Sequence, residues 1–176
     1  MQFHQRVILG VITGAVLIGG AQAATRVINM YEVDDEGVGN PIGSIKAEET
    51  DYGIVFTPEL DDLDEGLHGF HVHQHPSCEP GDKKGEMSAA LAAGGHYDPD
   101  NAGHHGSPWG DGHLGDLPAL YVDDDGQATT PVLAPRLTMD DLKGRALMIH
   151  EGGDNYADQP KPLGGGGARA ACGIVK

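Results

Sequence analysis

The chain has 176 residues, a formal net charge of −16 and only two cysteines. Its length is that of a single ordinary domain with a core of useful size. Lysine and arginine are scarce and nowhere clustered, and the large negative charge argues against binding to nucleic acid or another anionic polymer. The composition therefore argues against nucleic-acid partners. It says little about the fold, which the order of apolar segments and turn residues predicts.

The first 23 residues are predicted to be a secretory signal peptide. An apolar run follows Arg6, ends near Ile18, and leads to an Ala-Gln-Ala cleavage site whose last residue is Ala23. A membrane anchor is the alternative, but the run is short and rich in glycine for a hydrocarbon layer of about 30 Å. We therefore expect export, no membrane attachment after cleavage, and a mature domain over 24–176.

Short apolar segments separated by Gly, Asp, Asn and Pro follow in chain order, which predicts an antiparallel β-sandwich or barrel. The expected strands lie within 25–33, 43–50, 53–60, 66–73, 119–122, 127–135, 145–152 and 171–176. Residues 34–43 and 123–126 carry turn chemistry. One short helix is predicted over 137–144, with Thr138 as its N-cap and Asp141 three positions later.

Two long segments are not expected to form strands: about Gln74 to Asp116, and Glu151 to Arg169. Loops of this length in a compact domain are usually functional or disordered. The first of them holds most of the histidines, so function is the better explanation for it.

Histidines are the candidate ligands. In "GFHVHQHPSC", His71 and His73 stand two positions apart, and side chains at such positions share one face of a strand, as two ligands of one metal must. A polar strand face that happens to use histidine is the alternative. His150 ends another expected strand, and further candidates come from the first long loop: His96, His105, His113 and Asp116.

The two cysteines, Cys78 and Cys172, are an even pair in a chain expected to be exported. Such a pair favours a disulfide, and a pair of soft metal ligands is the alternative.

Four separated motifs, "GFHVHQ", "AAGGHYDP", "GHLGDLPAL" and "GGGGARAACG", occur in the order typical of one family. Together they resemble Cu,Zn superoxide dismutase of the bacterial exported type, over about Thr25 to Lys176. The resemblance implies an all-β, eight-stranded antiparallel Greek-key sandwich or barrel with long metal-bearing loops. It also implies a periplasmic enzyme that converts superoxide to dioxygen and hydrogen peroxide.

The resemblance further implies two metal cofactors. It assigns copper to His71, His73, His96 and His150, and zinc to His96, His105, His113 and Asp116. His96 would bridge the two metals through its two ring nitrogens. Four imidazoles suit Cu(II), and three imidazoles with one carboxylate suit Zn. Asp154 would link ligand histidines of both metals, with a residue of a loop turn as the alternative.

The resemblance also assigns roles in substrate binding and in the disulfide. Arg169 matches the arginine that lies beside copper and acts on the small anionic substrate, superoxide. Cys78 and Cys172 match the family disulfide. The resemblance gives His68 no ligand role. Steering by Lys83, Lys84 or Lys161 stays open, as do the roles of His75 and His104, although spacing favours His105 over His104 as the ligand.

Two other functions fit parts of the pattern. A non-enzymatic periplasmic copper- and zinc-binding protein would use the same histidines, but it needs neither a bridging His96 nor Arg169. A zinc hydrolase would leave the copper-type histidines unexplained. The sequence leaves open whether the chain is a monomer or a homodimer, and whether Trp109 lies at an interface or packs within its loop.

Overall fold

The structure is a computed structural model and describes residues 23–176; the predicted leader lies outside these residues except for Ala23. The elements, in chain order, are β1 (Thr25–Val33), β2 (Val38–Thr50), β3 (Gly53–Leu60), β4 (Gly66–His68), β5 (Phe70–His73), β6 (Gly81–Lys83), β7 (Glu86–Ser88), η1 (Leu91–Ala93), β8 (Leu120–Val122), β9 (Val132–Ala134), α1 (Met139–Leu142), β10 (Ala146–His150), η2 (Leu163–Gly165) and β11 (Arg169–Ile174).

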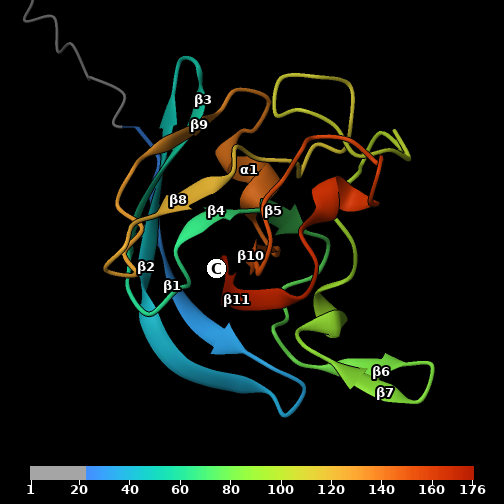
Figure 1. Ribbon diagram of the computed structural model, residues 1–176. Helices are drawn as coiled ribbons and strands as arrows, with labels where there is room; N and C mark the ends of the chain where they lie inside the picture. The colour runs from blue at the N-terminus through green and yellow to red at the C-terminus, as the bar shows by residue number, and fades with distance from the viewer. Residues whose placement is uncertain (1–22) are drawn as a thin grey trace, which may run out of the picture.

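Seven strands form one antiparallel sheet in the order β5-β10-β11-β1-β2-β3-β9. The last strand, β11, lies between β1 and β10, so the chain closes back on its beginning. A separate pair, β4 with β8, completes the frame, and β6 with β7 forms a small hairpin. Figure 1 shows the large sheet curling round, and the predicted antiparallel β fold is confirmed.

The core is enclosed between the curled sheet and the β4–β8 pair. Along β1, Ile28 and Met30 are buried while the residues beside them are exposed or partly so, as expected for a strand with one face inward. Phe56 of β3 meets Phe70 of β5 edge to face, with ring centroids 5.3 Å apart. Leu120 of β8 belongs to the same buried cluster, which therefore joins the pair to the sheet.

The predicted elements agree with the structure in most places. Residues 25–33 and 53–60 are strands with the predicted ends, and α1 begins after Thr138. The backbone N–H and hydroxyl of Thr138 both donate to the carboxylate of Asp141, at 2.9 and 2.7 Å, which fixes the first turn as a capping box does. The helix is shorter than predicted because Lys143 is already extended, with ψ 128°, and Gly144 has φ +66°.

Several expectations were wrong in detail; the strand predicted over 127–135, for example, is only β9, and the one predicted over 171–176 begins at Arg169. The turn predicted over 34–43 ends at Gly37, because β2 starts at Val38 and pairs with β1 through two register shifts. The strand predicted over 66–73 is divided at Gly69 into β4 and β5, which pair with different partners. The first long loop, expected to lack strands, contains the β6–β7 hairpin.

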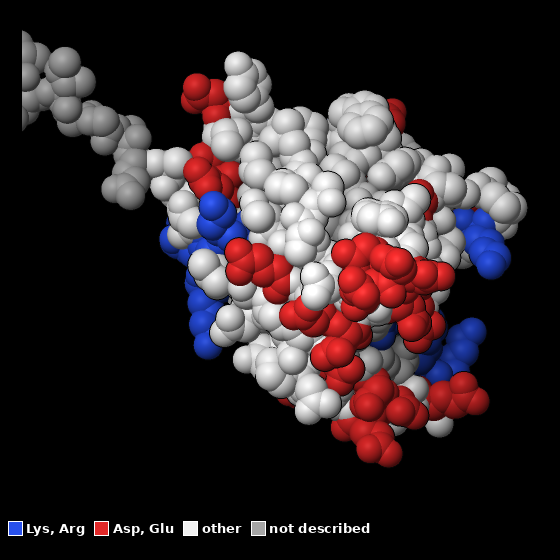
Figure 2. Space-filling view, turned by 60° about the vertical axis from the view of Figure 1, so that its left-hand side comes forward, with Lys and Arg blue, Asp and Glu red and all other residues white. Residues whose placement is uncertain are grey.

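The surface is strongly and unevenly acidic. On the face drawn in Figure 2, Asp and Glu side chains gather in one large patch, and Lys and Arg lie toward the edges of the view. One shallow hollow is lined by Glu32, Asp34, Asp62, Asp64 and Glu151 among other residues. Within residues 23–176, no helix combines the length and the apolar character needed to cross a membrane.

Candidate metal centre

Three of the predicted ligands come from two neighbouring strands. His71 and His73 lie in β5, where all four residues are buried, and His150 is the last residue of β10. These strands are antiparallel neighbours, with His71 opposite Met148 and His73 opposite Ala146. Strand pairing therefore brings the three imidazoles to one end of the sheet although 77 positions separate His73 from His150.

The loop ligands are held against β5 by backbone pairing. His96 pairs with His73, and Asp116 pairs with His71, as isolated antiparallel bridges. Around them, Val72 N donates to Gly115 O at 2.9 Å, and Tyr97 N donates to Val72 O at 2.8 Å. The long loop thus adds two short bridged stretches along the edge of β5 that is not paired with β10, which explains how irregular chain can place ligands rigidly.

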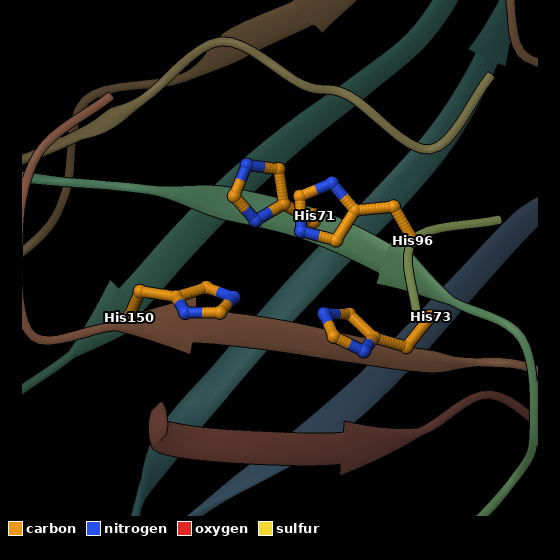
Figure 3. A group of neighbouring side chains, drawn as sticks. All are labelled: His71, His73, His96 and His150. Carbon is orange, nitrogen blue, oxygen red and sulfur yellow. The ribbon is translucent and has the colours of Figure 1, made fainter. Parts of the chain in front are cut away.

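The first group consists of His71, His73, His96 and His150, whose ligand atoms all lie within 4.8 Å of one another. In each ring one buried nitrogen has no hydrogen-bond partner: Nδ1 of His71, and Nε2 of His73, His96 and His150. Figure 3 shows the four rings gathered around one point, beside β5 and β10. Buried polar atoms are rarely left without a partner, so these four lone pairs fit a bound metal.

The other nitrogen of each of these rings is held in place. His71 Nε2 donates to Asp154 Oδ2 at 2.8 Å, and His73 Nδ1 donates to Gly94 O at 3.0 Å. His150 Nδ1 donates to Gly167 O at 3.3 Å. Because carbonyl and carboxylate oxygens only accept, they fix the proton on that side and leave the opposite nitrogen free as a ligand.

The second group converges on one carboxylate oxygen. The Nδ1 atoms of His96, His105 and His113 lie 2.8, 3.0 and 3.3 Å from Asp116 Oδ1. Ligand atoms around a tetrahedral zinc with bonds of about 2.0 Å lie about 3.3 Å apart, so this spacing fits such a site. The other oxygen, Asp116 Oδ2, accepts from Gly106 N at 2.9 Å.

The mutually close set around Asp116 differs from the predicted zinc set by one histidine. It contains His71, His96, His105 and Asp116, all buried, and His113 lies at its margin with a side chain 12% exposed. His71 is close because it stands between the two groups, but its Nε2 is occupied by Asp154 and its Nδ1 faces the first group. The direction of the ring nitrogens, and not the distance alone, therefore assigns His71 to the first group and leaves His113 as the candidate for the second.

Asp154 connects the two groups. Its Oδ2 accepts from His71 Nε2 and its Oδ1 accepts from His105 Nε2, each at 2.8 Å, and its side chain is fully buried. Gly164 makes room for this carboxylate: it has φ +70°, and a Cβ there would lie 2.0 Å from Asp154 Oδ1. Asp154 therefore links one histidine of each group.

Burial dominates the ionisation of the first group. It lowers the pKa of His71, His73 and His96, and lowers the pKa of His150 to about 4. Burial also lowers the pKa of His105, but hydrogen bonds with Asp116 and Asp154 outweigh it and raise the pKa to about 9. The first group is thus neutral near pH 7, as metal ligands must be.

The metal-free protein is expected to lose stability as the pH falls from about 6.5 to about 4. In this window the unfolded histidines take up protons while the buried rings resist them, at up to about 1.4 kcal/mol per pH unit for each ring. Because the pKa of His105 is raised to about 9, its protonation stabilises the folded state fully below about pH 6.5, and this contribution is lost as the pH rises to about 9. Denaturant unfolding of chelator-treated protein across the window measures the slope. A free energy of unfolding that stays constant there contradicts the prediction.

Arg169 lies at the start of β11, next to the first group. Its guanidinium donates to Ala90 O and Gly94 O, two carbonyls of the long loop. After burial and the neighbouring His96, the charge of Arg169 also lowers the pKa of His73. A fixed, half-buried cation therefore lies beside the imidazoles of the first group.

The other predicted residues lie apart from the two groups. His68 is buried in β4, with its ring nitrogens facing His150 O and Asp64 O at 2.7 and 2.8 Å. The side chains of His75, His104, Lys83, Lys84 and Lys161 are exposed, and Trp109 is 69% exposed. His105, and not His104, enters the second group, as the spacing favoured.

Sequence reasoning missed two arginines that grip the ligand-bearing loop. Arg136 donates to three carbonyls of this loop, including that of His113. Arg145 donates to Gln74 O at 2.6 Å and stacks on the Tyr97 ring at 4.0 Å. Neither residue lies in a recognisable motif, because their partners are backbone carbonyls and one ring far along the chain.

The fold and the two histidine groups define a class: an antiparallel β protein with two adjoining groups of side chains that could each hold a metal ion. Comparison with known proteins makes this specific. The family model described as copper/zinc superoxide dismutase matches residues 42–175. Superoxide dismutase [Cu-Zn] of Pasteurella multocida (strain Pm70) is 62% identical over 148 residues, covering 82% of this chain and 80% of the relative.

Two further relatives agree. The same-named protein of Escherichia coli (strain K12) is 55% identical over 166 residues, with 94% of this chain and 96% of the relative covered. The Cu/Zn superoxide dismutase structure from Brucella abortus superposes with a TM-score of 0.86 at 49% identity, covering 87% of this chain and all of that one.

The chain belongs to the copper/zinc superoxide dismutase family. It is an oxidoreductase that uses copper and zinc and acts on superoxide, which favours the enzyme over a non-enzymatic metal-binding protein.

Proposed function

We propose that the chain converts superoxide to dioxygen and hydrogen peroxide in the bacterial periplasm. The mature domain covers 24–176 and is released from the leader 1–23. Copper is held by His71, His73, His96 and His150, and zinc by His96, His105, His113 and Asp116. One observation carries the assignment: His96 directs Nε2 to the first group while its Nδ1 lies 2.8 Å from Asp116 in the second.

The periplasmic location is supported by the chain itself. Cys78 and Cys172 form a disulfide, with Cα atoms 5.7 Å apart, which is ordinary for such a bond. Structural disulfides persist in oxidising compartments such as the periplasm and are rare in the cytosol. An N-terminus at Ala24 in protein recovered from a periplasmic extract is the expected sign of export; protein retained in the cytosol with its leader opposes it.

The donor sets suit the two metals. Four imidazole nitrogens favour Cu(II), and three imidazoles with a carboxylate favour Zn. Copper would supply the one-electron oxidation of one superoxide and the one-electron reduction of another, while zinc would fix the shared imidazole. The overall reaction consumes two superoxide ions and two protons and yields one dioxygen and one hydrogen peroxide.

His96 provides the proton-holding step. Its Nδ1 lies 2.8 Å from Asp116 Oδ1 and its Nε2 has no partner in the protein, so this ring could hold a proton on Nε2 while Asp116 keeps it in place. Burial lowers the pKa of His96, which favours passing this proton on to the reduced product. Asp154 keeps His71 and His105 oriented through the cycle.

Arg169 positions the anion. The net charge of the chain is strongly negative, but capture depends on the local field at the site and not on the total. Superoxide dismutases are themselves a standard example of such steering. The guanidinium is braced by Ala90 O and Gly94 O, so its remaining donors keep a fixed direction.

Arg169→Ala is expected to lower kcat/KM for superoxide by about tenfold or more, because a local cation speeds the capture of an anion by about 10–10³-fold. Wild type and variant are each expected to hold one copper and one zinc per chain. Pulse-radiolysis rates with metal analysis of the same samples test this, and Arg26→Ala, which removes an exposed arginine, is the matched control. Wild-type kinetics in Arg169→Ala, or active protein with only one kind of metal, contradicts the proposal.

A further inference from the structure

Arg136 lies between β9 and α1 and reaches across to the long loop. Its Nε donates to Pro108 O at 2.9 Å, its Nη1 to Gly112 O at 2.9 Å, and its Nη2 to His113 O at 2.5 Å. The guanidinium is half-buried. One side chain therefore holds three carbonyls of a segment that is distant in sequence.

The segment that Arg136 holds has little structure of its own. No strand or helix is assigned between η1 and β8. Its internal backbone bonds are few, among them Gly110 N to Ser107 O at 2.9 Å and His113 N to His104 O at 3.2 Å. Without an outside brace, such a segment would have many conformations to lose when its ligands are fixed.

The held carbonyls connect directly to the second histidine group. His113 itself places Nδ1 3.3 Å from Asp116 Oδ1. Gly112 packs so closely on Gly106 that a Cβ on Gly112 would lie 2.5 Å from Gly106 N, and that N–H donates to Asp116 Oδ2. The direction of two of the four proposed zinc ligands therefore depends on the backbone that Arg136 fixes.

We propose that Arg136 is a positioning residue for zinc: its planar guanidinium holds the 108–113 backbone so that His113 and Asp116 meet the metal in a preformed arrangement. This rests on the proposed zinc ligands. Arginine suits the task because its donors form a rigid fork, whereas lysine offers a single point of charge. The positive charge of Arg136 would by itself repel Zn²⁺ and weaken its binding. The proposed positioning effect strengthens zinc binding, so the two effects have opposite signs.

The test uses the full-length mature protein loaded with copper and zinc, in the variants Arg136→Lys and Arg136→Met. Zinc retention against a competing chelator is expected to weaken by about 10- to 100-fold in both, the usual effect of losing a partner that orients a ligand. Copper retention is expected to stay at the wild-type level. Cobalt(II) placed in the zinc site reports its geometry, and its visible bands are expected to change in both variants.

Two reference variants make the outcomes distinct. Arg26→Lys changes an exposed arginine away from the loop and should leave both metals unaffected. His113→Ala should lose zinc; if it keeps zinc as the wild type does, the proposed ligand set fails, and the inference about Arg136 with it.

If His113→Ala loses zinc while both Arg136 variants keep wild-type zinc retention and cobalt bands, Arg136 has no positioning role. Tighter zinc binding in Arg136→Met shows that repulsion dominates and overturns the proposal. Parallel loss of copper and zinc, with a matching loss of stability in the metal-free chain, shows a merely structural role and overturns it too.

Discussion

His96→Ala is expected to abolish the coupling of the two metals and to cost more activity than any change beyond the ligands. The variant removes one ligand from each group, because His96 Nε2 faces the copper set and Nδ1 faces Asp116. Loss of an orienting partner alone costs about 10–100-fold, so loss of the shared ligand should exceed about 100-fold in superoxide turnover. Optical and EPR spectra of copper, recorded with zinc present and absent, measure the coupling.

The control for this variant is His104→Ala. His104 is exposed and belongs to neither group, and its ring nitrogens contact only Ala102 O and Asp111. Its removal tests whether losing any loop histidine changes the spectra. Copper spectra of His96→Ala that match the wild type, or that still respond to zinc as the wild type does, would show that His96 is not shared.

The reason His96 matters is visible in how the rings lie. Its ring stacks on that of His71, with centroids 3.9 Å apart, and stands edge-on to His105 at 5.3 Å. Asp154 joins these same two neighbours on their far nitrogens. The His96 ring is therefore enclosed by fixed neighbours, which would keep it in place between the two metals that we propose it shares.

The positions of the strands were the feature of the fold that the sequence predicted best. The segments 25–33 and 53–60 are short apolar runs between clear turn signals, and both strands end where predicted. The start of β2 at Val38 was missed because Gly39, Asn40 and Pro41 are turn formers, and their place in a strand depends on a bulged pairing with β1. Local propensity yields to such tertiary pairing.

The proposed ligand set came from motifs, and its geometry could not be predicted from them. Alternation placed His71 and His73 on one face, yet only strand pairing shows that His150 joins them. The proximity of His71 to Asp116, and the marginal place of His113, follow from an isolated bridge between positions 45 apart. The proposed role of Arg136 could not be predicted from the sequence, because its partners are backbone carbonyls and every residue type has one.

Reduction of Cys78–Cys172 is expected to have the largest effect on stability. The bond closes a loop with a sequence separation of 94, for which the chain-entropy estimate is roughly 4–5 kcal/mol; removing a native disulfide from a small secreted domain costs about 2–5 kcal/mol. Denaturant unfolding of metal-free protein, before and after complete reduction, measures this difference.

Reduction should also loosen the metals. Cys172 is buried in β11 between Tyr31 and Met148, and it packs in one cluster with Cys78 and Ala90. Ala90 O in turn accepts from Arg169, and Gly94 O accepts from both Arg169 and His73. The disulfide thus anchors the same loop whose carbonyls orient Arg169 and a copper ligand, and it does so through a rigid part of the sheet.

Copper retention against a chelator is therefore expected to fall on reduction, together with the activity. The double variant Cys78→Ser/Cys172→Ser should reproduce both losses without a reductant, which excludes direct reduction of the metal as the cause. Because the brace from Arg136 lies outside the disulfide-anchored stretch, zinc should be lost less readily than copper. Unchanged melting temperature and metal content after full reduction would show that the sheet and Arg169 hold the loop without the covalent bond.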